Sequence, residues 1–149
     1  MSHRFTSLFT HLIFSTKDRS PHLDREIAPE CLAYIGGIIK DIGGRRIAIG
    51  GVADHVHLLV DVPATMALSD LVRTIKSNSS KWIHENRNRP KFAWQMGYSA
   101  FSVSRSGVDN VVRYIRNQEE HHRRVGYQDE VRAFLKKHGM ACDERHMWE

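Results

Sequence analysis

Residues 55–62 constrain most strongly what this chain can fold into. The run is apolar, lacks Gly and Pro, and has the composition of a β-strand. Side chains alternate between the two faces of a strand, so His55 and His57 would point the same way. The opposite face would hold the apolar Val56, Leu58, Val60 and Val62. Two imidazoles aimed at one point suit a metal ion, and a polar strand face is the alternative interpretation.

A second strand is predicted at residues 45–49, joined to the first by a loop of residues 50–54. The glycines and Asp54 of this loop favour a β-hairpin, which places the histidine pair in an antiparallel sheet. Alternation also predicts strands at 5–15 and at 92–104, the latter with a break at Gly97. Apolar spacing predicts helices at 24–42, 68–88 and 106–124 and a short helical segment at 128–138.

The predicted order is strand, helix, strand, strand, helix, strand, followed by an extra helix. This is the ferredoxin-like βαββαβ pattern, also used by RNA-recognition domains. We therefore expect an α+β fold with an antiparallel sheet, helices packed on one face and an additional C-terminal helix that carries Tyr114. With 149 residues the chain has the size of one domain, and we assign residues 1–149 to it.

Composition limits the setting in which the chain works. No apolar run approaches the roughly 20 residues of a membrane span, and polar residues interrupt the N-terminal stretch where a signal peptide would have its apolar core. Cys31 and Cys142 cannot form a disulfide framework. We expect a soluble cytoplasmic protein. An excess of 22 Lys and Arg over 17 Asp and Glu favours a polyanionic partner, although an ordinary basic surface would give the same count.

The helix predicted at 106–124 carries a second group of chemical interest. A capping-box-like pair, Ser106 and Asp109, would begin it. Tyr114 and Gln118 lie one turn apart on a flank of its apolar stripe, because a helix advances about 100° per residue. They can therefore act at one site. The alternative is a tyrosine at the edge of the core beside a solvated glutamine. The apolar stripe itself consists of Val108, Val111, Val112 and Ile115.

Three motifs follow one another along the chain: His55-Val56-His57, the segment from Trp94-Gln95 through Gly97-Tyr98 to Val103, and the segment from Tyr114 to His122. This ordered set resembles the single-tyrosine HUH transposases of the insertion-sequence 200 and 605 type, a superfamily that includes the REP-associated tyrosine transposases. The resemblance spans essentially the whole chain. It implies that Tyr114 is the nucleophile and that His55, His57 and Gln118 bind a divalent metal, Mg²⁺ or Mn²⁺.

The resemblance also implies the reaction and the partners. Tyr114 would cleave single-stranded DNA that carries a hairpin at the element ends, leaving a 5′-phosphotyrosine link and a free 3′-OH that allow rejoining. No nucleotide cofactor is expected, in agreement with the absence of a G-x-x-x-x-G-K-[ST] motif. The family implies a homodimer at the nucleoid of a bacterial or archaeal cell, with no membrane partner and with Tyr114 serving either subunit. The alternatives are a domesticated repeat-processing nuclease and a non-catalytic module that binds single-stranded nucleic acid.

Further residues are interpreted more simply. The polar face of the helix at 68–88 carries basic and hydroxyl side chains suited to phosphates. Trp94 and Trp82 are candidates for stacking on bases, and Trp82 falls on the apolar stripe. His121 and His122 are interpreted as an exposed pair, with metal or phosphate contacts as the alternative. The expected DNA contacts are Arg73, Lys76, Ser80 and Lys81, with Ser77 beside them.

Overall fold

The structure, a computed structural model, describes residues 3–149; the first two residues of the N-terminal stretch analysed for a signal peptide lie outside it. Four strands form one sheet in the order β2-β3-β1-β4, with every neighbouring pair antiparallel. This confirms the predicted α+β fold with a ferredoxin-like sheet. The strands are β1 (Phe9–Ser15), β2 (Arg45–Val52), β3 (His55–Asp61) and β4 (Ser99–Ser102).

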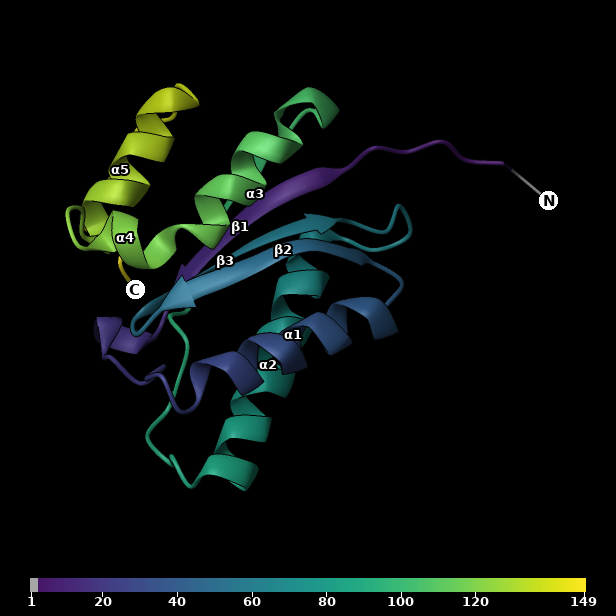
Figure 1. The fold of residues 1–149 in the computed structure, drawn as a ribbon. Coiled ribbons are helices and arrows are strands. Elements are labelled where there is room, and N and C mark those ends of the chain that lie inside the picture. The colour runs from purple at the N-terminus through teal and green to yellow at the C-terminus, as the bar shows by residue number, and fades with distance from the viewer. Residues whose placement is uncertain (1–2) are drawn as a thin grey trace.

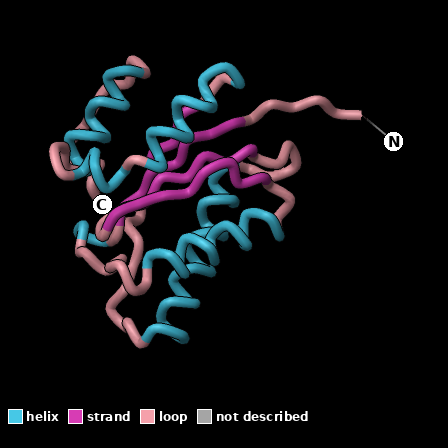
Figure 2. Tube along the Cα trace, viewed as in Figure 1, coloured by secondary structure: helices cyan, strands magenta, loops and turns pink. Residues whose placement is uncertain are grey.

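Helices cover both faces of this sheet. Figure 1 shows α1 (Ala28–Asp41) and α2 (Leu68–Arg87) on one face, as expected for the βαββαβ unit. The other face carries the additional C-terminal helices, α3 (Val108–Arg116), α4 (Gln118–His122) and α5 (Tyr127–Lys137). The three layers, helices, strands and helices, are also clear in the trace of Figure 2. No helix within residues 3–149 has the length and apolar character that crossing a membrane requires.

The main core lies between the sheet and the α1–α2 layer. Leu12 and Phe14 of β1 and Val56 and Leu58 of β3 are fully buried there, against Ile75 and its neighbours on α2. Burial of aliphatic side chains removes about 1.5 to 3 kcal/mol of unfavourable hydration for each large residue. The predicted apolar face of the histidine strand is therefore confirmed.

Three predicted strands have wrong boundaries. The strand expected at 5–15 begins only at Phe9. The hairpin loop is only Ala53-Asp54, because Gly50 and Gly51 stay in β2 and pair with His57 and Val56. The strand expected at 92–104 is reduced to β4, preceded by an isolated bridge between Thr16 and Trp94. The side chain of Gln95 explains the shortening, since its Oε1 accepts the hydrogen bond of Ser15 N at 2.7 Å in place of a strand carbonyl.

The third helix differs from its prediction at both ends. It begins at Val108 after a 3₁₀ turn, without the expected cap from Ser106, whose hydroxyl instead contacts that of Ser104. It also stops at Arg116. At Asn117 the backbone leaves the helical region with φ −102° and ψ 22°, and α4 starts at the next residue. Asparagine is a weak helix former because its short amide competes for backbone hydrogen bonds.

Candidate active site and metal centre

His55 and His57 are fully buried on the face of β3 that α3, α4 and α5 cover. Each ring is fixed through Nδ1: His55 Nδ1 lies 2.6 Å from Asp54 Oδ1, and His57 Nδ1 lies 2.8 Å from His11 Nε2. A second partner of this kind orients the metal-binding histidines of many proteins and leaves Nε2 free to bind. Both Nε2 atoms therefore point into the same space.

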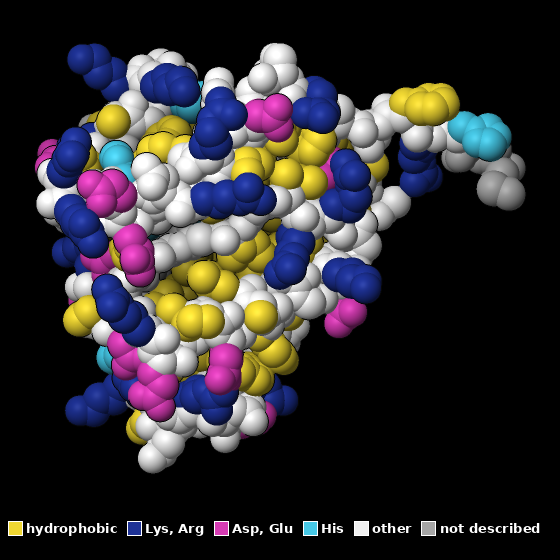
Figure 3. Space-filling model, viewed as in Figure 1, with side chains coloured by type: hydrophobic (Ala, Val, Ile, Leu, Met, Phe, Trp, Pro, Cys, Tyr) yellow, Lys and Arg dark blue, Asp and Glu magenta, His cyan; other side chains and the backbone are white. Residues whose placement is uncertain are grey.

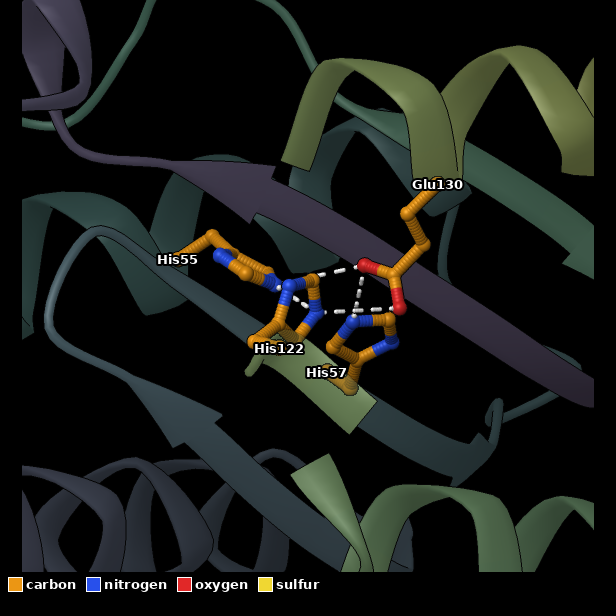
Figure 4. Close-up of side chains that lie close together, drawn as sticks. All are labelled: His55, His57, His122 and Glu130. Carbon is orange, nitrogen blue, oxygen red and sulfur yellow. Dashed lines mark hydrogen bonds and ion pairs between the residues drawn. The ribbon is translucent and has the colours of Figure 1, made fainter. Parts of the chain in front are cut away.

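Two side chains from the C-terminal helices enter that space. Glu130 Oε1 lies 2.8 Å from His57 Nε2 and 3.2 Å from His55 Nε2. His122 Nε2 lies 2.9 Å from His55 Nε2 and 3.1 Å from Glu130 Oε2. Figure 4 shows the three imidazoles and the carboxylate converging from β3, α4 and α5. Their four donor atoms lie within 4.8 Å of one another.

Tyr114 reaches the same cluster from α3. Its hydroxyl donates a hydrogen bond to Glu130 Oε2 and lies 3.1 Å from His121 Nε2. Its ring centre is 5.6 Å from that of His57. Partial burial, together with the hydrogen bond and negative charge of Glu130, raises the pKa of Tyr114 above its usual range. The phenol is therefore protonated at neutral pH in the metal-free site.

Gln118 is buried, with 2% of its surface exposed, at the start of α4. Its Nε2 donates to the carbonyl of Tyr114 at 3.3 Å, while its Oε1 is a buried acceptor with no hydrogen-bond partner among residues 3–149. Within residues 3–149 no hydrogen bond joins Gln118 to the histidines. The structure thus groups His55, His57 and Tyr114 directly and places Gln118 beside Tyr114.

The ionisation of the cluster follows from its burial. Burial lowers the pKa of His57 to about 4, against the opposing effect of Glu130, so this imidazole is neutral at pH 7. Burial also opposes protonation of His55, but its hydrogen bonds to Asp54 and Glu130 raise its pKa above the ordinary value. Burial alone would raise the pKa of Glu130; hydrogen bonds from His122, His55 and His57 instead hold it far below its usual range. Glu130 is ionised.

These residues fit a divalent cation. Imidazole nitrogens and a carboxylate oxygen are ordinary ligands of Zn²⁺ and other first-row metals. The unpartnered Oε1 of Gln118 is a further buried acceptor, on a side chain that bonds to the backbone of Tyr114. A cation would also compensate the charge of the buried carboxylate, which is costly to leave without a full positive partner.

Gly50 controls how closely α3 approaches the sheet. It pairs with His57 in the β2–β3 ladder and lies under the last turn of α3. A Cβ atom at this position would lie 2.6 Å from the carbonyl oxygen of Ile115, closer than real contacts allow. Only glycine therefore permits the spacing that holds Tyr114 over the histidines.

Sequence reasoning missed several members of the cluster. Glu130 shares a helical stripe with Tyr127, Val131 and Phe134, and a carboxylate on an otherwise apolar stripe was the available signal. His11 lies between Phe9 and Ile13 on one face of β1. A histidine on this otherwise apolar face was the signal available in the sequence. The interpretation of His121 and His122 as an exposed pair is wrong, because both contact Glu130 and 9% of the His122 side chain is accessible.

The expected DNA contacts lie on α2, across the sheet from Tyr114. Arg73 pairs with Asp70 at 2.5 Å. Lys76 is partly buried, which lowers its pKa to about 8, and its Nζ donates to the carbonyls of Gln95 and Gly97. Its ammonium is thus largely used within the protein. Lys81 is exposed. A groove of about 450 Å³ beside α2 includes Arg73, Lys76, Ser77 and Ser80 in its lining.

The two tryptophans differ in their surroundings. Trp94 is buried between Phe14 and Phe92, and its indole N–H donates to Ser79 Oγ at 2.9 Å. It belongs to the core and offers no face to a base. Trp82 is half-buried and stacks on Tyr34 with ring centres 5.2 Å apart.

A second groove, of about 480 Å³, opens beside the cluster itself. Its lining includes Asp54 and His122 and three basic side chains, Arg19, Arg25 and Arg123. The positive charge of the chain is not confined to this groove. Figure 3 shows Lys and Arg side chains scattered over one face of the molecule with Asp and Glu among them. Local position therefore distinguishes these three arginines, rather than a large basic patch.

Comparison with known proteins agrees with this geometry. The chain is 26% identical over 116 residues to the ISDra2 transposase TnpA of Deinococcus radiodurans, a match that covers 74% of this chain and 83% of the relative. A crystal structure from Deinococcus radiodurans, described as that of a transposase, superposes with a TM-score of 0.63 at 25% identity and covers 79% of this chain and 95% of that one.

A REP-associated tyrosine transposase bound to a REP hairpin shares the fold, with a TM-score of 0.59 at 18% identity over 82% of this chain and 74% of that one. The sequence model of the family described as IS200-like transposases matches residues 4–118, which include both strand histidines, Tyr114 and Gln118. The family match covers most of the chain, and the histidine pair that it includes is oriented through Nδ1 and lies beside Tyr114. The chain therefore belongs to the IS200-like transposase family, whose members cleave DNA and transfer strands.

Proposed function

We propose that this protein cleaves and rejoins single-stranded DNA through a covalent 5′-phosphotyrosine at Tyr114. One observation carries the proposal: the hydroxyl of Tyr114 donates to the carboxylate of Glu130, whose other oxygen contacts His55 and His57. Nucleophile and histidine pair therefore share one site within a single chain. The family membership supports the reaction class.

In the proposed reaction Tyr114 Oη attacks the scissile phosphorus. The Oη–P bond forms, the P–O3′ bond breaks, and the 3′-oxygen leaves with the electron pair and takes a proton from water. The phenolic proton is held toward Glu130 Oε2, which is placed to receive it. The phosphodiester energy is kept in the tyrosyl link, so a 3′-OH of another strand can attack it and restore Tyr114 without a nucleotide cofactor.

We propose His55, His57 and Gln118 as ligands of a divalent cation, Mg²⁺ or Mn²⁺. When bound, this cation would supply Lewis-acid stabilisation of the phosphate and of the departing oxygen. His11 and Asp54 would hold the two imidazoles in the required orientation through their Nδ1 atoms. The buried Oε1 of Gln118, which lacks a partner within the described chain, supports its inclusion.

The substrate we propose is single-stranded DNA next to a hairpin. The three arginines of the groove beside His122, Arg19, Arg25 and Arg123, can contact backbone phosphates that lead into the site. A protein of this fold has been solved bound to a REP hairpin, which supports a hairpin as part of the substrate. We further propose a homodimer that acts at the nucleoid, in the cytoplasm of a bacterial or archaeal cell.

The test uses single-stranded DNA from the sequence that flanks the gene, labelled at its 3′ end. The protein is incubated with it in Mn²⁺ or in chelator and separated on a denaturing gel. We expect a labelled adduct in Mn²⁺ only, absent from Tyr114→Phe. The matched control is Tyr34→Phe, which removes an exposed hydroxyl on α1 and should leave the adduct intact. DNA binding with no adduct across many flanking substrates would point to a purely binding protein.

A further inference from the structure

Donors from beyond the family-matched region reach the histidine pair. The match ends at residue 118, whereas His122 lies in α4 and Glu130 in α5. Both come within 3.2 Å of His55 Nε2, at 2.9 Å for His122 Nε2 and 3.2 Å for Glu130 Oε1. The part of this chain that the family describes therefore holds only some of the donor atoms gathered at the site.

The position of Glu130 is unusual for a carboxylate. Only 2% of its surface is exposed, and its ion-pair partners within residues 3–149 are four imidazoles, with no Lys or Arg among them. A buried anion of this kind needs a full positive charge beside it, which a divalent cation would provide.

The donor atoms lie close enough together to bind one cation. Ligand atoms on opposite sides of a zinc-sized ion are about 4 Å apart. One imidazole nitrogen each of His55, His57 and His122 and a carboxylate oxygen of Glu130 all lie within 4.8 Å of one another. Figure 4 shows that these side chains approach from different directions around a common centre, as the ligands of one ion do.

We propose that Glu130 and His122 are ligands of the same cation as His55 and His57, so that α4 and α5 complete the metal site within one chain. This inference rests on the proposed function for the presence of a metal and adds ligands to it. Glu130 would bind through Oε1, which faces the two strand histidines, while Oε2 stays with the hydroxyl of Tyr114. One carboxylate then joins cation and nucleophile.

The enlarged ligand set has a consequence for metal choice. Three imidazoles and one carboxylate suit Mn²⁺, Zn²⁺ and other first-row ions better than Mg²⁺, which prefers oxygen ligands and retains water. We therefore expect tighter binding of Mn²⁺ than of Mg²⁺. A site made of the strand histidines and Gln118 alone would show a smaller preference.

The test measures Mn²⁺ binding by calorimetry, without DNA and without reference to activity. Glu130→Gln removes the charge and nearly preserves the shape, and we expect it to weaken Mn²⁺ binding at least about tenfold, the lower end of what the loss of even an outer partner costs. The matched control is Asp129→Asn, the neighbouring carboxylate on α5, whose side chain is 73% exposed and pairs with Arg132. Its Mn²⁺ affinity should equal that of the original protein. Wild-type affinity in Glu130→Gln would overturn the inference.

A second measurement covers the case in which Glu130→Gln fails to fold. Pulsed electron paramagnetic resonance on the Mn²⁺-loaded protein counts the coordinated imidazoles. We expect three in the original protein and two in His122→Asn, with circular dichroism showing that the fold is kept. Two imidazoles in both proteins would exclude His122 as a ligand.

The two proposals fail separately. Tight Mn²⁺ binding that depends on Glu130, with no DNA adduct under any condition, would refute the proposed function and leave the ligand set standing. A Tyr114-dependent adduct, together with a Mn²⁺ affinity that is unchanged by substitution of Glu130 and His122, would refute the ligand set and leave the proposed function standing.

Discussion

On the face of the sheet covered by α1 and α2, β3 buries Val56 and Leu58 in a continuous apolar core. On the face covered by α3, α4 and α5, the same strand buries His55 and His57 among polar partners. The apolar residues of this second face form two smaller clusters, one around Phe9 and Leu59 and one around Ile13 and Phe101.

The difference shows how one strand can serve both stability and chemistry. The apolar face fixes the backbone of β3, and a fixed backbone holds the imidazoles of the other face within the narrow tolerances of a metal or catalytic site. His55 and His57 themselves contribute little apolar burial, although apolar clusters lie beside them on the same face. Substitutions of adjacent residues should therefore separate stability from activity.

The largest effect is expected for His57→Ala. Loss of this ligand should reduce the rate of DNA adduct formation in Mn²⁺ by about 10³-fold or more, which corresponds to the several kcal/mol that metal assistance supplies. Chelator-treated His57→Ala should still unfold cooperatively, because the apolar face is untouched. Adduct formation at the original rate would break the comparison, since it would show that the histidine face is not the reaction centre.

The opposite result is expected for Leu58→Ala, the next residue of the strand. Leu58 is fully buried in the main core, and its truncation should lower the free energy of unfolding by about 2 to 5 kcal/mol. Mn²⁺ affinity of the folded fraction should stay unchanged. Urea unfolding and calorimetry measure the two quantities, and equal loss of both would show that the faces are not independent.

A smaller decrease in the rate of adduct formation is expected for Gly50→Ala. This variant tests the contact between β2 and α3 on the histidine face. The new Cβ would lie 2.6 Å from the carbonyl of Ile115, so α3 must shift and carry Tyr114 with it. A displacement of about 1 Å can cost roughly 100-fold in rate. The control is Gly37→Ala on α1, where nothing lies within 4 Å and where alanine should stabilise the helix by about 1 kcal/mol. Adduct rates that match in the two variants would contradict the positioning role of Gly50.

The smallest effect concerns pH and His11. Burial lowers the pKa of His11 to about 3, whereas in the unfolded chain it stays near 6.5. Between these values the unfolded state binds the extra proton, so the contribution of His11 to stability falls as pH is lowered from about 6.5, by up to about 1.4 kcal/mol per pH unit. In chelator, His11→Leu should show a flatter fall of unfolding free energy between pH 6.5 and 4. Parallel curves would mean that His11 is protonated in the folded state.

The sequence predicted features that depend on local alternation. The spacing of His55 and His57 against Val56 and Leu58 determined which face is polar, and the element order determined the sheet. Features that depend on distant partners were missed. Glu130 lies 73 residues from His57, and only the packing of α5 on the sheet brings the two together.

The breaks in predicted elements have the same cause. The side chain of Gln95 bonds to the backbone of Ser15, 80 residues away, and ends the pairing that the alternation of residues 92–104 had predicted. Asn117 interrupts a helix that the apolar periodicity alone predicts to continue. No Gly or Pro at this position signals the break in the sequence. The role of Gln118 stays a prediction. Its position beside Tyr114 followed from helical spacing, while its unpartnered oxygen could be seen only in the structure.

Tyr114 bonds to the Glu130 and His121 of its own chain. If this site is the reaction centre proposed above, each chain in this conformation would contain all of its residues, and each folded chain would count as one centre. The number of centres would then rise in proportion to the number of folded chains, and an assembly with one damaged subunit would keep the centres of its intact subunits.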